Sequence, residues 1–181
     1  MAEENNGKTY RFDVCDDCKS TCCQDAKPPL TKNRQKIIQA YLEKQKIEIT
    51  QPFTCEQYSY PSVDEHLYCR LLNKTTKKCL VHPVKPETCR AGPITFDINF
   101  KTRKLEFFLK KEKICALSGV LHKNPELFKN HFEAAKPEII NLVEELSANE
   151  LRAIVKIEEP DTFKVDEVDL SIDVIKKLGL T

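Results

Sequence analysis

Nine cysteines dominate the chemistry available to this chain, and four of them crowd into the stretch CDDCKSTCC at positions 15 to 23. Cys15 and Cys18 form a C-x2-C pair, whose turn lets two thiolates converge on one ion, as in zinc sites and iron–sulfur sites. Cys15, Cys18 and Cys22 stand at i, i+3 and i+7, which places them on one face of a helical or turn segment. The stretch therefore predicts a metal centre.

Cys23 directly follows Cys22, and adjacent side chains diverge by about 100° in a helix and by about 180° in a strand. The two thiolates are therefore not expected to bind the same metal in a relaxed tetrahedral geometry. The adjacency predicts either two neighbouring metal centres or one ligand beside one packed thiol.

The remaining cysteines are single and widely spaced. Cys69, Cys79 and Cys89 follow one another at intervals of ten, and Cys115 comes later. Without Cys55, which we interpret as a small hydrophobic side chain, eight cysteines remain as candidate metal ligands. Eight thiolates suit two zinc ions with four cysteines each, two cubane iron–sulfur clusters, or one cluster plus four structural thiols.

Cationic side chains near the cysteines are expected to lower the pKa of these thiols from the free value of about 8.5 and to offset the charge of a thiolate-bound metal. These cations are Lys19, Lys27, Arg70, Lys77, Lys78, Lys85 and Arg90. His82 stands in a C-x2-H arrangement with Cys79, yet we interpret it as a packed or hydrogen-bonded ring. The other polar candidates are interpreted as surface, core or capping groups beside soft sulfur ligands: His66, His122, His131, Asp16, Asp17 and Asp25.

The elements that must position these cysteines are short, and they predict an α+β fold. Thr31 is a helix N-cap for a helix ending near Gln45. Two hairpins are predicted, one in LYCRLL-NKTTKK-CLVH and one at 94–110, where hydrophobic residues alternate. From Asn124 the pattern is helical, with a second helix predicted to begin at Pro137 and a short last helix to end at Gly179. We therefore expect a cysteine-rich metal-binding domain at 10–121 and an acidic helical extension at 122–181.

The net charge of +1 conceals an asymmetry along the chain. Residues 1–130 hold 23 Lys and Arg against 16 Asp and Glu, which gives +7, whereas residues 131–175 hold 4 against 12, which gives −8. The acidic extension is thus a candidate surface for a protein partner. Neither a nucleic-acid-binding stripe nor a membrane span is predicted, and the N-terminus lacks a secretory signal, so we expect a cytoplasmic protein. In that compartment clustered cysteines are typical of metal or redox sites rather than disulfides.

In order and spacing the cysteines resemble those of the YkgJ-type cysteine-cluster family, described as zinc- or iron-chelating domains and related to flagellin lysine N-methylase. The resemblance covers about residues 12–120. It rests on the run Cys15, Cys18, Cys22 and Cys23, the helix from Thr31, the step from Cys69 to Leu72, the segment CLVHPVKPETCR with Cys79, Val81, Pro86, Cys89 and Arg90, and the late Cys115. His82 and Lys85 depart from the family, which usually has tyrosine and arginine there. The resemblance implies that the eight cysteines other than Cys55 bind metal.

Three functions remain open on the sequence. The first is a metal-binding protein that holds iron–sulfur clusters, or zinc, for redox, metal-handling or structural use. The second, by analogy with the methylase branch, is an S-adenosylmethionine-dependent protein lysine N-methylase, although the chain contains no recognisable motif for the methyl donor. The third is a structural zinc scaffold for partner binding. Because the downstream cysteines are widely separated singles rather than close pairs, the sequence favours iron–sulfur over zinc.

Overall fold

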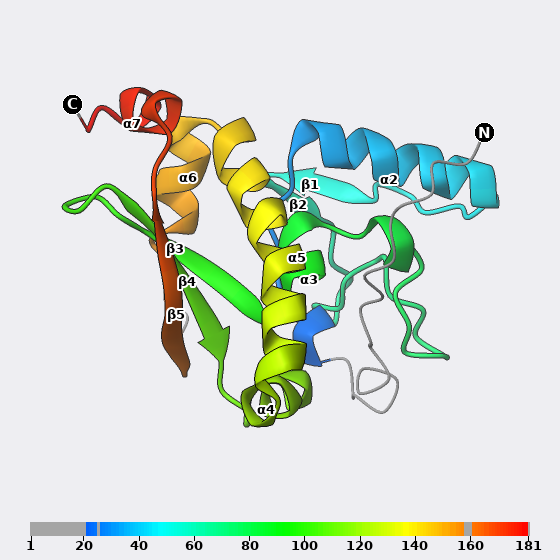
Figure 1. Ribbon diagram of the computed structural model, residues 1–181. Coiled ribbons are helices and arrows are strands. Elements are labelled where there is room, and N and C mark those ends of the chain that lie inside the picture. Colours follow the sequence, from blue (N-terminus) through cyan, green and yellow to red (C-terminus); the bar gives the residue numbers. More distant parts are fainter. Residues whose placement is uncertain (1–20, 25, 158–160, 181) are drawn as a thin grey trace, which may run out of the picture.

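The computed structural model describes residues 21–24, 26–157 and 161–180, so Cys15 and Cys18 lie outside the described residues. In this part of the chain, helices combine with a two-stranded and a three-stranded antiparallel sheet, which confirms the predicted α+β class (Figure 1). No described helix is both long enough and apolar enough to cross a bilayer.

The first half of the described chain carries most of the cysteines on short elements around one long helix. Helix α2 spans Lys32–Gln45, as predicted, because the Thr31 side chain accepts a hydrogen bond from the Arg34 N–H at 3.0 Å. Its buried residues Ile38 and Leu42 pack with Leu71 and Val81 in a small hydrophobic core. The other elements are η1 (Thr21–Cys23), β1 (Phe53–Cys55), β2 (Ser59–Pro61), η2 (His82–Val84) and α3 (Glu87–Ala91).

The larger core lies on one face of the three-stranded sheet. Strands β3 (Ile94–Asn99) and β4 (Lys104–Lys110) form the predicted hairpin, and β5 (Thr162–Asp169) pairs antiparallel with β4. In β4, Leu105, Phe107 and Leu109 are buried while the alternate positions are more exposed, as expected for a sheet covered on one face. Strand β5 is a difference from the sequence analysis, which predicted only helical structure after residue 122.

Four helices from the second half cover that face: α4 (Ala116–Lys123), α5 (Pro125–Glu145), α6 (Ala148–Ile154) and α7 (Ile172–Leu178). The second helix predicted to begin at Pro137 is wrong, because α5 runs through that proline without a break. Although an interior proline costs a helix about 3 kcal/mol, Ala135, Ile139, Leu142 and Val143 are buried on both sides of it. Core packing therefore outweighs the local signal.

The predicted hairpin around Cys69 and Cys79 is also wrong in its extent. Only one isolated bridge joins its two arms, between Leu72 and Cys79. The intervening turn is held by Asn73, whose side-chain oxygen accepts from the N–H groups of Thr75 and Thr76 at 3.0 Å each. These contacts fold the segment into consecutive turns instead of strands.

Helix α5 connects the two halves of the described structure. It contacts β3 and also α3, the short helix that carries Cys89 (Figure 1). The larger core combines residues of the β3–β4 hairpin with residues of α5, α6 and α7. This core therefore spans the predicted boundary between 121 and 122, and the division into two domains stays a prediction.

Candidate metal centre

Six of the eight predicted ligands lie among the described residues, on separate short segments. Cys22 and Cys23 belong to η1, Cys69 and Cys79 to the turn-rich segment between β2 and η2, and Cys89 to α3. Cys115 is the N-cap residue of α4. Each of these thiols is free.

Backbone hydrogen bonds join η1 to the turn-rich segment that carries Cys69 and Cys79. The Cys69 N–H donates to the Cys23 carbonyl at 2.8 Å, and the bridge between Gln24 and Tyr68 continues this pairing. The Leu72 N–H in turn donates to the Cys69 carbonyl at 3.0 Å, next to the bridge between Leu72 and Cys79. Chain segments that are far apart in sequence are thus tied together at their cysteines.

The thiols of this group also influence one another electrostatically. The pKa of Cys89 is raised by burial and further by Cys69, Cys79 and Cys22, while Lys85 opposes the shift. Burial raises the pKa of Cys69 to about 11, with smaller contributions from Cys79 and Cys22. Cys22, Cys23, Cys69, Cys79 and Cys89 thus influence one another's pKa; we call these five residues the thiol cluster.

Within the thiol cluster, the two adjacent cysteines behave in opposite ways. The Cys23 thiol donates a hydrogen bond to the Cys22 sulfur, which lowers the pKa of Cys22 to about 6, with help from Lys85 and Lys110. The same hydrogen bond, with burial and the neighbouring thiols, raises the pKa of Cys23. Cys22 is exposed and is the member best prepared to act as a thiolate.

The expectation that nearby cations lower the thiol pKa values is therefore wrong for most of the thiol cluster. Lys85 lowers the pKa of Cys22, but for Cys79 and Cys89 burial outweighs it and the pKa rises. The reason is that burial removes water from the thiolate. This loss of hydration free energy exceeds the favourable interaction of the thiolate with one nearby ammonium group.

The other predicted site residues lie in different surroundings. Cys115 packs partly buried against the larger core, whereas Cys69 and Cys79 pack against the smaller one. Cys55 is exposed on β1, and its exclusion from the ligand set stays a prediction. His82 and His66 are exposed, the His122 ring packs edge-on against Phe163 at 5.5 Å, and His131 is buried.

The described thiols do not form a complete coordination shell. Among the described residues, which exclude Cys15 and Cys18, no three Cys, His, Asp or Glu side chains form a group that could already hold a metal ion. The donor set nevertheless fits zinc or an iron–sulfur cluster, because it consists of sulfur ligands. In metal-binding domains of this kind, the metal itself completes the site on folding.

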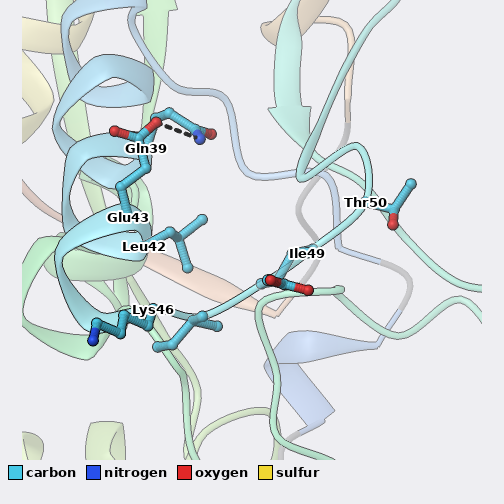
Figure 2. Close-up of a pocket in the computed structure, with 8 residues that line it drawn as sticks. Gln39, Leu42, Glu43, Lys46, Ile49 and Thr50 are labelled. Atoms are coloured by element: carbon cyan, nitrogen blue, oxygen red, sulfur yellow. Dashed lines mark hydrogen bonds between the residues drawn. The ribbon is translucent and has the colours of Figure 1, made fainter.

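A groove of about 590 Å³ lies between the end of α2 and residues 46–50 (Figure 2). Its lining includes Leu42, Ile47 and Ile49 together with Gln39, Glu43 and Lys46. Among the described residues, neither a cysteine nor an aromatic side chain lines the groove. The methylase alternative stays an untested prediction.

A short α+β scaffold that gathers free cysteines from several segments defines a cysteine-cluster protein of the metal-chelating class. Comparison with known families agrees: residues 14–116 match the family named CxxCxxCC, whose description is "Putative zinc- or iron-chelating domain". The match spans more than half of the chain, and the chain belongs to this family. No curated protein and no solved structure matches the chain.

Proposed function

We propose that the chain is an iron–sulfur protein whose cluster is held by cysteines of the predicted set: Cys15, Cys18, Cys22, Cys23, Cys69, Cys79, Cys89 and Cys115. The observation that carries this proposal is the thiol cluster, in which the thiols of η1, α3 and the segment between β2 and η2 influence one another's pKa. A bound cluster would supply single-electron chemistry at this place.

The electrostatics of the thiol cluster support a resident cation. Burial and mutual repulsion disfavour several thiolates in the metal-free protein, as the raised pKa values of Cys69, Cys79 and Cys89 indicate. A metal centre supplies the missing positive charge. Its binding therefore releases the protons of the thiols and at the same time stabilises the fold. Lys85 lies close enough to affect Cys22, Cys79 and Cys89, and it offsets part of the excess negative charge of four thiolates.

The choice of iron–sulfur over zinc rests on how the cysteine ligands are distributed along the chain. Structural zinc sites commonly draw their ligands as close pairs, whereas Cys69, Cys79 and Cys89 come from separate turns and a short helix. A cluster is larger than one ion, so scattered thiolates reach it more easily. The all-sulfur donor set suits it as well.

The test is anaerobic purification of the full chain, followed by metal and acid-labile sulfide analysis and by Mössbauer or electron paramagnetic resonance spectroscopy. We expect iron and sulfide in matching amounts. Stoichiometric zinc without sulfide would overturn the iron–sulfur proposal and leave a zinc site.

The ligand set is tested by paired substitutions. Cys89→Ala is expected to reduce the metal content strongly, because the pKa of Cys89 is raised by three other thiols of the thiol cluster. Cys55→Ala is the matched control, since Cys55 is exposed on β1 and belongs to no such group. Equal loss of metal from both variants would show that the nine cysteines are divided wrongly.

A further inference from the structure

The placement of Cys89 depends on contacts from outside its own helix. Helix α3, Glu87–Ala91, has only five residues, and isolated helices shorter than about 12 residues are marginal in water. The contacts that fix Cys89 must therefore come from other elements. Helix α5, which lies beyond the segment that matches the family, contacts α3 more extensively than any other helix does.

Glu138 of α5 binds the residue that directly follows Cys89. Its carboxylate accepts from Arg90 Nε at 2.6 Å and from Arg34 Nη2 of α2 at 2.7 Å. Arg90 Nη1 also donates to the Pro83 carbonyl at 2.9 Å, so its guanidinium is held on two sides. All three side chains of this ion network are mostly shielded from solvent, where removal of one partner leaves the others unpaired at a high cost.

The Arg34 side of this network reaches back to the start of α3. Arg34 Nε lies 3.5 Å from Glu87 Oε1, and the same oxygen accepts from the Thr31 hydroxyl at 2.7 Å. Glu87 is only 1% exposed. Glu138 therefore connects both ends of the short helix that carries Cys89.

His131, a second residue of α5, contacts the C-terminal end of the helix that carries Cys89. Its Nε2 lies 3.2 Å from the carbonyl oxygen of Ala91, two residues after Cys89, and the side chain is 8% exposed. Burial lowers the pKa of His131, so the ring is neutral and donates from Nε2 to this carbonyl. The contact satisfies a carbonyl at the end of α3 that has no partner within so short a helix.

We propose that Glu138 and His131 of α5 are positioning residues for the Cys89 thiolate, which they hold toward the metal through Arg90 and the Ala91 carbonyl. The inference rests on the proposed function, because it takes Cys89 to be a metal ligand. In metal sites, hydrogen-bonding groups behind the ligands fix the orientation of the ligands, and loss of such a group lowers metal affinity about 10- to 100-fold. The inference assigns this role to α5, which lies outside the segment that matches the family.

The test uses the full chain, reduced and metal-free, titrated with Co²⁺ as a spectroscopic probe. The thiolate-to-cobalt charge-transfer band reports the number of sulfur ligands on each bound ion, and a purely structural role would not change it. Glu138→Gln removes the charge that binds both arginines. Glu145→Gln is the matched control on the same helix, because Glu145 is exposed and its only described contact is with Asn141.

We expect Glu138→Gln to weaken Co²⁺ binding about tenfold or more and to reduce the band per bound cobalt by the share of one thiolate, while Glu145→Gln behaves as wild type. If Glu138→Gln does not fold, His131→Leu and His131→Gln provide the same comparison. Leucine removes the donor to Ala91, whereas the glutamine amide retains one, so His131→Gln should recover part of the affinity and the band.

The outcomes separate the two proposals. A wild-type chain without a thiolate-to-cobalt band would overturn the proposed metal site, and this inference with it. A wild-type band that stays unchanged in affinity and intensity in Glu138→Gln or His131→Leu would overturn the positioning role alone. Equal weakening in Glu145→Gln would also overturn it, because the effect would then come from the charge of α5 and not from its contacts to α3.

Discussion

Cys22 and Cys23 share one hydrogen bond and differ because of it. The thiol of Cys23 stays protonated and donates, and the sulfur of Cys22 accepts, so the pKa of Cys22 falls to about 6 while that of Cys23 rises. The two alternatives for this adjacency, two centres or one ligand beside a packed thiol, both stay predictions. A donor thiol beside an exposed thiolate also gives an incoming metal a first point of attachment, since the thiolate is the metal-binding form.

The difference between cysteines can be measured by alkylation of the metal-free protein. Thiolates react and thiols do not, so the rate at each cysteine rises with pH through its pKa. Cys22 should react fully at neutral pH, with a midpoint near pH 6. Cys69, with a pKa of about 11, should react only in strongly alkaline solution. Mass spectrometry of the alkylated peptides over a pH series gives both midpoints.

Lys85→Gln provides the control for this measurement. Removal of the positive charge should raise the midpoint of Cys22, because Lys85 is one of the groups that stabilise its thiolate. Parallel pH profiles for Cys22 and Cys69 would contradict the assignment of the Cys22 thiolate.

At the scale of the elements, α5 is held by packing against the sheet and not by its own sequence. Pro137 has no N–H to donate and lies in the middle of the helix, yet the residues around it are buried. Pro125 occupies the first turn of the same helix, where a missing N–H costs nothing. The two prolines therefore form a matched pair.

We expect Pro137→Ala to raise the free energy of unfolding, by roughly 2–3 kcal/mol. The gain in the helix interior is about 3 kcal/mol, reduced by up to about 1 kcal/mol because alanine leaves the unfolded chain more freedom. Pro125→Ala should lower stability slightly or leave it unchanged. Urea denaturation followed by circular dichroism compares the two variants, and equal shifts would show that Pro137 is accommodated without cost.

The elements that the sequence predicted are those with strong local signals. Helix α2 has the Thr31 cap, the β3–β4 hairpin has alternating hydrophobic residues, and α7 ends at Gly179, whose φ of 67° suits glycine. Strand β5 was missed because its sequence, TFKVDEVD, is half charged. Its charges are balanced across the sheet: Lys164 binds Glu106 at 2.7 Å, and Lys104 binds Glu167. This compensation depends on pairing with β4, which no local pattern reveals.

The candidate site divides in the same way. Cysteine spacing predicted the metal-binding class and the set of ligands to be tested, because clustered thiols at such intervals are typical of metal sites. The approach of Cys69 to Cys23 was not predictable, since it depends on backbone bonds between distant segments. The contact between Arg90 and Glu138 joins residues 48 apart and carried no sequence signal at all.

Across the whole molecule, acidic side chains of the second half form ion pairs with basic side chains of the first half. Asp161 lies 2.6 Å from Lys113 and 3.6 Å from Lys111, and Glu138 binds Arg34 and Arg90. Several carboxylates of the acidic second half thus meet cations of the basic first half. The Asp161 pairs are the more exposed ones and contribute little stability each, whereas the Glu138 network is largely shielded from solvent. The use of the acidic extension by a protein partner stays a prediction, with these carboxylates already engaged.

A chain ended at residue 121 tests whether the first half can hold the metal without the second. The β3–β4 hairpin would lose Ile139, Leu142, Leu151 and Val174, which cover its apolar face in the larger core. Burial of each such side chain contributes about 1.5–3 kcal/mol, so their loss approaches the whole stability of a typical domain, about 5–15 kcal/mol. The same truncation removes the contacts of Glu138 and His131 with α3.

We therefore expect residues 1–121 to lack a cooperative thermal transition and to bind Co²⁺ weakly, with recovery when residues 122–181 are added in trans. A truncated chain that melts cooperatively and binds Co²⁺ like the full chain would show that 10–121 is an independent metal-binding domain.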